Sequence, residues 1–125
     1  LTGEITGGIG GTTYSVEYTT NGICPSQSIE TVLVNSVDDA SFVLTDYCAG
    51  SSNAASAVVT SGGSFSFNPL PSGSETIDVV TGELSGGIGG TTYSVEYTTN
   101  GVCVSSLIQN VLIYSTSSTG PIFHN

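Results

Sequence analysis

Four carboxylates are the side chains in this chain best suited to bind a ligand. Asp38 and Asp39 follow a short polar stretch, Asp46 lies near the end of one predicted strand, and Glu83 follows another. Calcium takes roughly six to eight oxygen ligands, and carboxylates gathered at a junction between modules can supply several of them. One hypothesis is therefore a calcium site at these four residues, all expected at one end of a module. The alternative is a solvated acidic end with no metal.

The cysteines offer a second kind of chemistry. Cys24, Cys48 and Cys103 have no C-x-x-C spacing, which argues against a zinc or thioredoxin-type motif and favours disulfide chemistry outside the cytoplasm. An alternating β-sandwich would bring Cys48 and Cys103 to the same end, so we predict a disulfide between them. Cys24 would then be unpaired, with its partner in a preceding repeat. Three free thiols are the alternative, because spacing does not prove connectivity.

No set of residues is typical of an enzyme. The single histidine, His124, follows the last predicted strand, where nothing would hold it against a nucleophile. The stretch GGIGG at 86–90 precedes a strand, whereas phosphate-binding glycine loops precede a helix. We expect no enzymatic activity, and no cofactor unless calcium binds.

Charge excludes several partners. Ten acidic residues and no Lys or Arg give a formal net charge of −10, so nothing in the chain resembles the clustered cations that bind nucleic acid or anionic lipid headgroups. No stretch approaches the roughly 18 apolar residues of a membrane span. We expect no nucleic-acid partner and no direct membrane insertion.

One sequence motif occurs twice. GGIGGTTYSVEYTTNG stands at 7–22 and again at 86–101, a period of 79 residues, and the match extends with three differences from Gly3 to Cys24. Self-similarity at a fixed period is typical of a tandem array of structural modules.

The elements that carry these residues read as short strands. Residues 91–99 alternate in polarity and end at Asn100-Gly101, which predicts a strand and a tight hairpin turn into a second strand at 102–114. Period-2 spacing places the tyrosines in the core rather than on a carbohydrate-stacking surface; these are Tyr14, Tyr18, Tyr93 and Tyr97. The other predicted strands are 40–48, 56–60, 64–68, 75–80 and 83–86.

Seven short strands separated by Gly, Ser, Asn and Pro predict an all-β chain built as an Ig-like antiparallel β-sandwich repeat. We assign residues 37–116 to one complete module, 1–34 to the last three strands of a preceding one, 35–39 to a linker and 117–125 to a tail. The partial module has unpaired edges and would need partner strands from elsewhere.

The stretch SFSFNPLPSGSETIDVVTGELSGGIGGTTYSVEYTTNGVC at 64–103 resembles the repeat unit of the giant surface adhesins of gliding Bacteroidetes. Within it, TIDVVTGELSGGIGGTTYSVEYT at 76–98 is similar to bacterial Ig-like and cadherin-like modules. The resemblance covers the chain from about residue 1 to residue 114 and leaves the tail out.

The resemblance implies a non-enzymatic repeat of a filamentous adhesin used in gliding motility and surface attachment. It further implies export by type IX secretion and an extracellular location on the bacterial cell surface, associated with the outer membrane through other parts of the full-length chain. The partners would be neighbouring repeats and an external surface or polysaccharide. The alternative function is a carbohydrate-binding or spacer module of a secreted multidomain polysaccharide-degrading enzyme.

Overall fold

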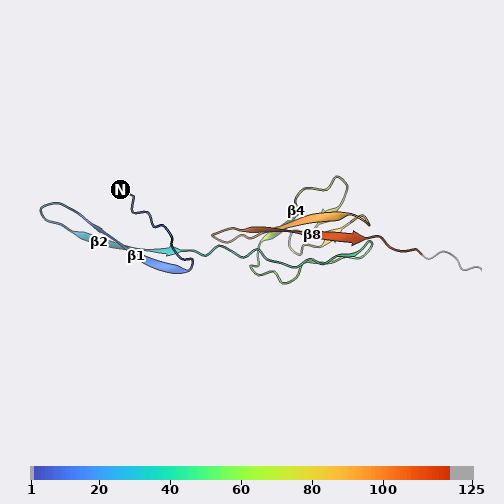
Figure 1. Ribbon diagram of the computed structural model, residues 1–125, viewed down its shortest axis with the longest axis horizontal. Coiled ribbons are helices and arrows are strands. Elements are labelled where there is room, and N and C mark those ends of the chain that lie inside the picture. Colours follow the sequence, from blue (N-terminus) through green and yellow to red (C-terminus); the bar gives the residue numbers. More distant parts are fainter. Residues whose placement is uncertain (1, 119–125) are drawn as a thin grey trace, which may run out of the picture. The chain divides into compact units, whose positions relative to one another are not determined.

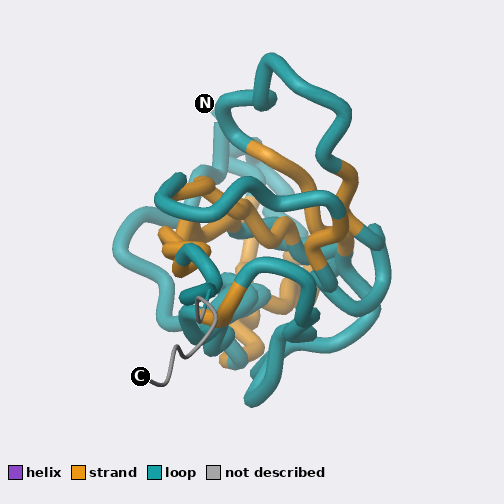
Figure 2. The backbone as a smooth tube through the Cα atoms, turned by 90° about the vertical axis from the view of Figure 1, so that its right-hand side faces the viewer, coloured by secondary structure: helices purple, strands orange, loops and turns teal. Residues whose placement is uncertain are grey.

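The computed structural model describes residues 2–118, and these residues form strands and loops with no helix (Figure 2). The all-β expectation is therefore confirmed. The chain divides into an N-terminal unit, Leu1–Val37, and a C-terminal unit, Asp38–Asn125, with the boundary inside the predicted linker. No helix among the described residues is long and apolar enough to cross a membrane.

The N-terminal unit is a single antiparallel hairpin, drawn in blue to cyan in Figure 1. Strand β1 (Thr12–Thr19) pairs with β2 (Gln27–Val34) along its full length. The alternating sequence of β1 puts Tyr14, Val16 and Tyr18 on one side of the hairpin, as period-2 spacing requires. Within this unit no second layer covers that side, and Tyr18 is 62% exposed.

The C-terminal unit is built on a four-stranded sheet in the order β3-β8-β7-β4. Its centre is the hairpin of β7 (Thr92–Thr98) and β8 (Ser106–Tyr114). Strand β4 (Ser64–Phe67) pairs antiparallel with β7, and β3 (Tyr47–Cys48) runs parallel to β8. Two short strands, β5 (Thr76–Ile77) and β6 (Leu84–Ser85), pair separately.

One face of this sheet carries the core. The predicted period-2 burial of β7 is confirmed, because Tyr93, Val95 and Tyr97 are each at most 5% exposed. Apolar side chains from β4, β6, β8 and the segment before β3 complete the cluster. They are Ala40, Phe42, Leu44, Phe65, Phe67, Leu84, Val111 and Ile113.

Several predicted strands are wrong in extent: 75–80 is a strand only at Thr76–Ile77, and 102–114 begins only at Ser106. The segment 40–48 is a strand only at Tyr47–Cys48, and 56–60 contributes only the bridge Val43↔Ser56. The apolar side chains Phe42 and Leu44 of segment 40–48 are buried all the same, so their packing holds it in place. Its backbone is satisfied by scattered bonds, such as Val59 N–H to the Ser41 carbonyl at 3.0 Å, rather than by a ladder.

The prediction of a tight hairpin turn at Asn100-Gly101 is also wrong. Strand pairing stops at Thr98↔Ser106, which leaves a loop over residues 99–105. Thr99 closes that loop because its N–H donates to the Ser105 carbonyl at 2.9 Å and its hydroxyl accepts the Ser105 N–H at 3.0 Å. Thr20 and Ser26 make the same two contacts in the N-terminal unit.

The repeated sequence folds the same way twice. Seven of the eight pairs in the β1–β2 register recur 79 positions later in β7–β8, so that Tyr14↔Val32 corresponds to Tyr93↔Val111. The glycine-rich turn recurs as well, because Gly11 N–H donates to the Val34 carbonyl at 2.6 Å and Gly90 N–H donates to the Ile113 carbonyl at 2.6 Å. The two hairpins are therefore structural copies of each other.

Candidate functional site

Asp38 and Asp39 lie at the loop end of the β7–β8 hairpin, where each accepts a backbone hydrogen bond. Asp38 Oδ2 accepts the Gly101 N–H at 3.0 Å, and Asp39 Oδ1 accepts the Ser41 N–H at 2.9 Å. The hydrogen bonds from Ser41 lower the pKa of Asp39. Both carboxylates thus hold the chain where it enters the C-terminal unit.

Asp46 lies toward the opposite end of that hairpin. Its Oδ1 accepts the N–H of Leu112, which pairs with Thr92 at the far end of β7 from the loop. The length of β7, seven residues, separates the two ends by about 20 Å. The expectation that the four carboxylates share one end is therefore wrong, because the segment from Asp38 to Asp46 runs along the hairpin instead of folding back.

No three His, Cys, Asp or Glu side chains in the described part of the chain are grouped so that they could hold a metal ion. Asp38, Asp39, Asp46 and Glu83 therefore do not form the single calcium site of the hypothesis. The separate hydrogen bonds that Asp38, Asp39 and Asp46 accept favour the alternative, a set of solvated acidic groups.

We therefore expect calcium to leave the thermal stability of this chain unchanged. The melting temperature in 5 mM CaCl₂ should match that in 5 mM EDTA within about 1 °C, because a ligand stabilises only the state that binds it. The measurement is a pair of calorimetric scans at constant ionic strength, with MgCl₂ as the control for general screening of charge. A calcium-specific rise of several degrees would contradict the separated arrangement.

The predicted Cys48–Cys103 disulfide does not form. Cys48 is paired with Tyr114 at the end of β8, whereas Cys103 precedes the start of that strand. The nine residues of β8 span about 30 Å, far beyond the 7 Å or so that two bridged Cα atoms tolerate. The physical reason is strand direction: the segment ending at Cys48 runs parallel to β8. Cys24 is exposed and forms no disulfide.

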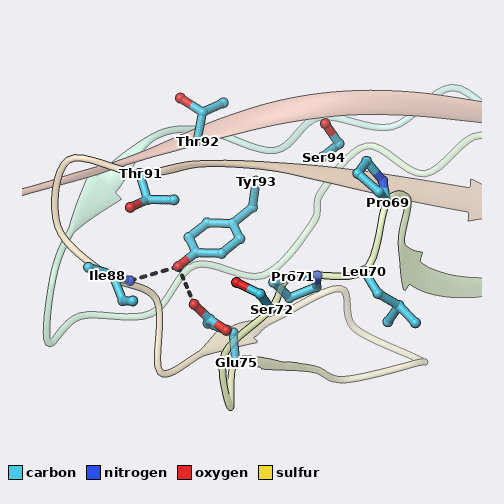
Figure 3. A pocket seen from close by; sticks show the side chains of 10 residues that line it. All are labelled: Pro69, Leu70, Pro71, Ser72, Glu75, Ile88, Thr91, Thr92, Tyr93 and Ser94. Atoms are coloured by element: carbon cyan, nitrogen blue, oxygen red, sulfur yellow. Dashed lines mark hydrogen bonds between the residues drawn. The ribbon is translucent and has the colours of Figure 1, made fainter.

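A cluster of hydrogen-bonded groups surrounds Tyr93 at the glycine-rich end of the hairpin. Figure 3 shows the Tyr93 hydroxyl donating to Glu75 Oε1 at 2.8 Å and accepting the Ile88 N–H at 3.0 Å. A cavity of about 340 Å³ opens beside them, lined on one side by the turn at 69–72. Glu75 Oε2 is shielded from solvent without a well-formed hydrogen bond.

The two groups at this cavity shift each other's pKa in opposite directions. Hydrogen bonds from its own backbone N–H and from the Tyr93 hydroxyl lower the pKa of Glu75. Burial, and then the proximity of Glu75, raise the pKa of Tyr93, so the phenol stays protonated. A charged carboxylate and a neutral donor form a stable structural pair, and neither group is poised for proton transfer near neutral pH.

Glu75 should contribute stability that is lost in acid. A lowered folded-state pKa stabilises the fold above the ordinary value of 4.5, and that contribution disappears as the pH falls through the folded-state value. We expect Glu75→Gln to flatten the decline in unfolding free energy below about pH 4.5, as measured by urea titration at several pH values.

The control for this experiment is Glu4→Gln in the other unit, which should leave the profile of the C-terminal unit unchanged. Part of the acid sensitivity should persist in Glu75→Gln, because hydrogen bonds from Thr81 lower the pKa of Asp78 and those from Ser41 lower that of Asp39. A Glu75→Gln profile parallel to that of the wild type would contradict the assigned role.

Sequence reasoning missed Glu75 and Gln109, two polar residues whose side chains make long-range hydrogen bonds in the C-terminal unit. Gln109 Nε2 donates to the Phe42 carbonyl at 2.5 Å, across 67 positions of sequence. Neither residue belongs to a motif, and only the long-range fold brings each to its partner. His124 lies outside the described residues.

Of the four tyrosines predicted to lie in the core, Tyr93 and Tyr97 are buried, whereas Tyr18 is 62% exposed, so the prediction is wrong for Tyr18 in this chain. Comparison of the chain with family models, with curated proteins and with solved structures found no match.

Proposed function

We propose that this chain is a non-enzymatic structural repeat of a filamentous cell-surface adhesin that serves gliding motility and surface attachment. The observation that carries the proposal is the recurrence of one hairpin, with the same register and the same turn contacts, 79 residues along the chain. A module repeated at fixed spacing builds a long array in which each unit contacts its neighbours.

Charge supports the same proposal. With ten acidic groups and no Lys or Arg, each unit repels the next, and repulsion along a string of modules keeps it extended and prevents its collapse. An extended tether needs length and mechanical continuity rather than a reactive site. An Ig-like sandwich, exported by type IX secretion to the bacterial surface, is the architecture and location we propose for it.

The test is to label living cells that produce the protein with a fluorescent antibody against residues 38–114. A motor-driven adhesin gives spots that travel along the cell and stop when the proton gradient is collapsed. Stationary spots would replace motility with passive attachment. Label found only in the medium would overturn the proposal in favour of a spacer in a secreted enzyme.

A further inference from the structure

The two copies of the hairpin differ in what covers them. In the C-terminal unit, Tyr97 is 2% exposed and Val111 is fully buried; their counterparts in the N-terminal unit, Tyr18 and Val32, are 62% and 42% exposed. The sequence of the first strand is identical in both copies. The N-terminal unit therefore presents as surface a face that the same residues use as core.

The C-terminal unit shows what such a face accepts. Phe65 lies against the Tyr97 ring with a centroid distance of 4.6 Å, and Phe42 contacts the same ring at 6.0 Å. The Tyr97 hydroxyl donates to the Thr60 carbonyl at 2.6 Å and accepts the Gly63 N–H at 2.9 Å. The cover therefore supplies aromatic rings together with one backbone acceptor and one backbone donor, all from the segment 38–85.

We propose that the exposed face of β1–β2 is a docking surface for a segment that repeats residues 38–79 of this chain and comes from another repeat. The docking face comprises the exposed Tyr18 and Val32 and the half-buried Tyr14, Val16 and Val34. The inference extends the proposed function by naming the partner of the N-terminal unit. Its test is a folding measurement, so it can succeed or fail independently of the adhesin assignment.

A second copy of the same face is a poorer partner. Two such faces packed together would bring Tyr18 hydroxyl groups together without the backbone donor and acceptor that satisfy Tyr97, and a buried hydroxyl without a partner costs about 1–3 kcal/mol. Glu30 stands on this face opposite Val16, so two copies would also bury like charges. A segment of the 38–79 type offers matched groups instead.

Glu30 sets the strength of the docking. Its counterpart is Gln109, whose Nε2 donates to the Phe42 carbonyl at 2.5 Å. A carboxylate at that position faces a carbonyl oxygen and cannot donate to it, which leaves both groups unsatisfied. We expect the docked N-terminal hairpin to be less stable than β7–β8, and Glu30→Gln to restore the missing hydrogen bond.

The experiment joins a copy of residues 38–79 directly before Leu1 of the full 125-residue chain, because Leu1 is the counterpart of Val80. We expect amide hydrogen exchange in β1 and β2 to slow by about 100-fold, since a covered hairpin exchanges only when the unit opens. Glu30→Gln in this extended chain should slow it by about a further 10-fold. The matched control carries Phe42→Ser and Phe65→Ser in the added copy alone and should lose the protection.

A second measurement guards against an extended chain that does not fold. A peptide of residues 38–79 is added to isotope-labelled full chain, and amide shifts at Tyr14 and Tyr18 are followed, with β7–β8 amides as the internal reference. Protection or shifts that the serine control abolishes support the proposal. Absence of both overturns it, as does slow exchange in β1–β2 of the unextended chain accompanied by dimerisation in sedimentation.

Discussion

Replacing Tyr97 with alanine is expected to lower the unfolding free energy of the C-terminal unit by about 3–5 kcal/mol. The side chain is 2% exposed and packs against two phenylalanine rings at 4.6 and 6.0 Å. Its removal leaves a cavity beside Phe42 and Phe65 and also removes the partner of the Thr60 carbonyl and the Gly63 N–H. Urea unfolding of the full chain measures the change.

The chain contains its own control for this substitution. Tyr18 lies in an identical stretch of sequence and in the same strand register, but its ring is 62% exposed. Tyr18→Ala should change the stability of the C-terminal unit by less than about 0.5 kcal/mol, as surface substitutions usually do. Equal losses of unfolding free energy from Tyr97→Ala and Tyr18→Ala would contradict this expectation. They would show that the contribution of the tyrosine does not depend on the residues packed over its ring.

Tyr97→Phe separates the ring from its hydroxyl. The aromatic contacts stay, while the Gly63 N–H loses its acceptor and the Thr60 carbonyl loses a donor. A buried polar group left unsatisfied costs about 1–3 kcal/mol, so the phenylalanine variant should fall between wild type and Tyr97→Ala.

Local patterns predicted that β7 and β8 pair, although not the length of the loop between them, because strand alternation is encoded locally. Alternation along β7 determines which side chains are buried, and the 79-residue repeat predicts that the same strand forms twice. The identical sequence has two exposures, however, and no pattern within β1 or β7 distinguishes them. Burial here depends on whether the segment 38–85 is present beside the hairpin, which is a tertiary property.

The wrong predictions of a disulfide and of a shared carboxylate site have a common cause in strand direction and long-range pairing. Alternation in 40–48 is compatible with either direction along β8, and the parallel one separates Cys48 from Cys103 and Asp46 from Asp38. The contacts of Gln109 and Glu75 likewise depend on which distant backbone or side chain arrives beside them. Residue types and spacing carry no information about such long-range contacts.

Substituting Gly63 with alanine is the second change expected to have a large effect. An added Cβ would overlap the Thr98 carbonyl oxygen and lie 2.8 Å from both Cζ and the hydroxyl oxygen of Tyr97. The Thr98 carbonyl belongs to backbone paired in the β7–β4 sheet, and the Tyr97 ring packs against Phe42 and Phe65. Neither group can move away without losing these contacts. We expect a loss of about 2–3 kcal/mol in the unfolding free energy of the C-terminal unit.

The same replacement at Gly22 is the control, because a Cβ there meets nothing within 4 Å. Gly22→Ala should leave the C-terminal unit within about 0.5 kcal/mol of wild type in urea unfolding. Gly63→Ala should also weaken the bond between the Gly63 N–H and the Tyr97 hydroxyl, so its effect should shrink when it is combined with Tyr97→Phe. Additive losses in the double variant would mean that the steric obstacle is the Thr98 backbone alone.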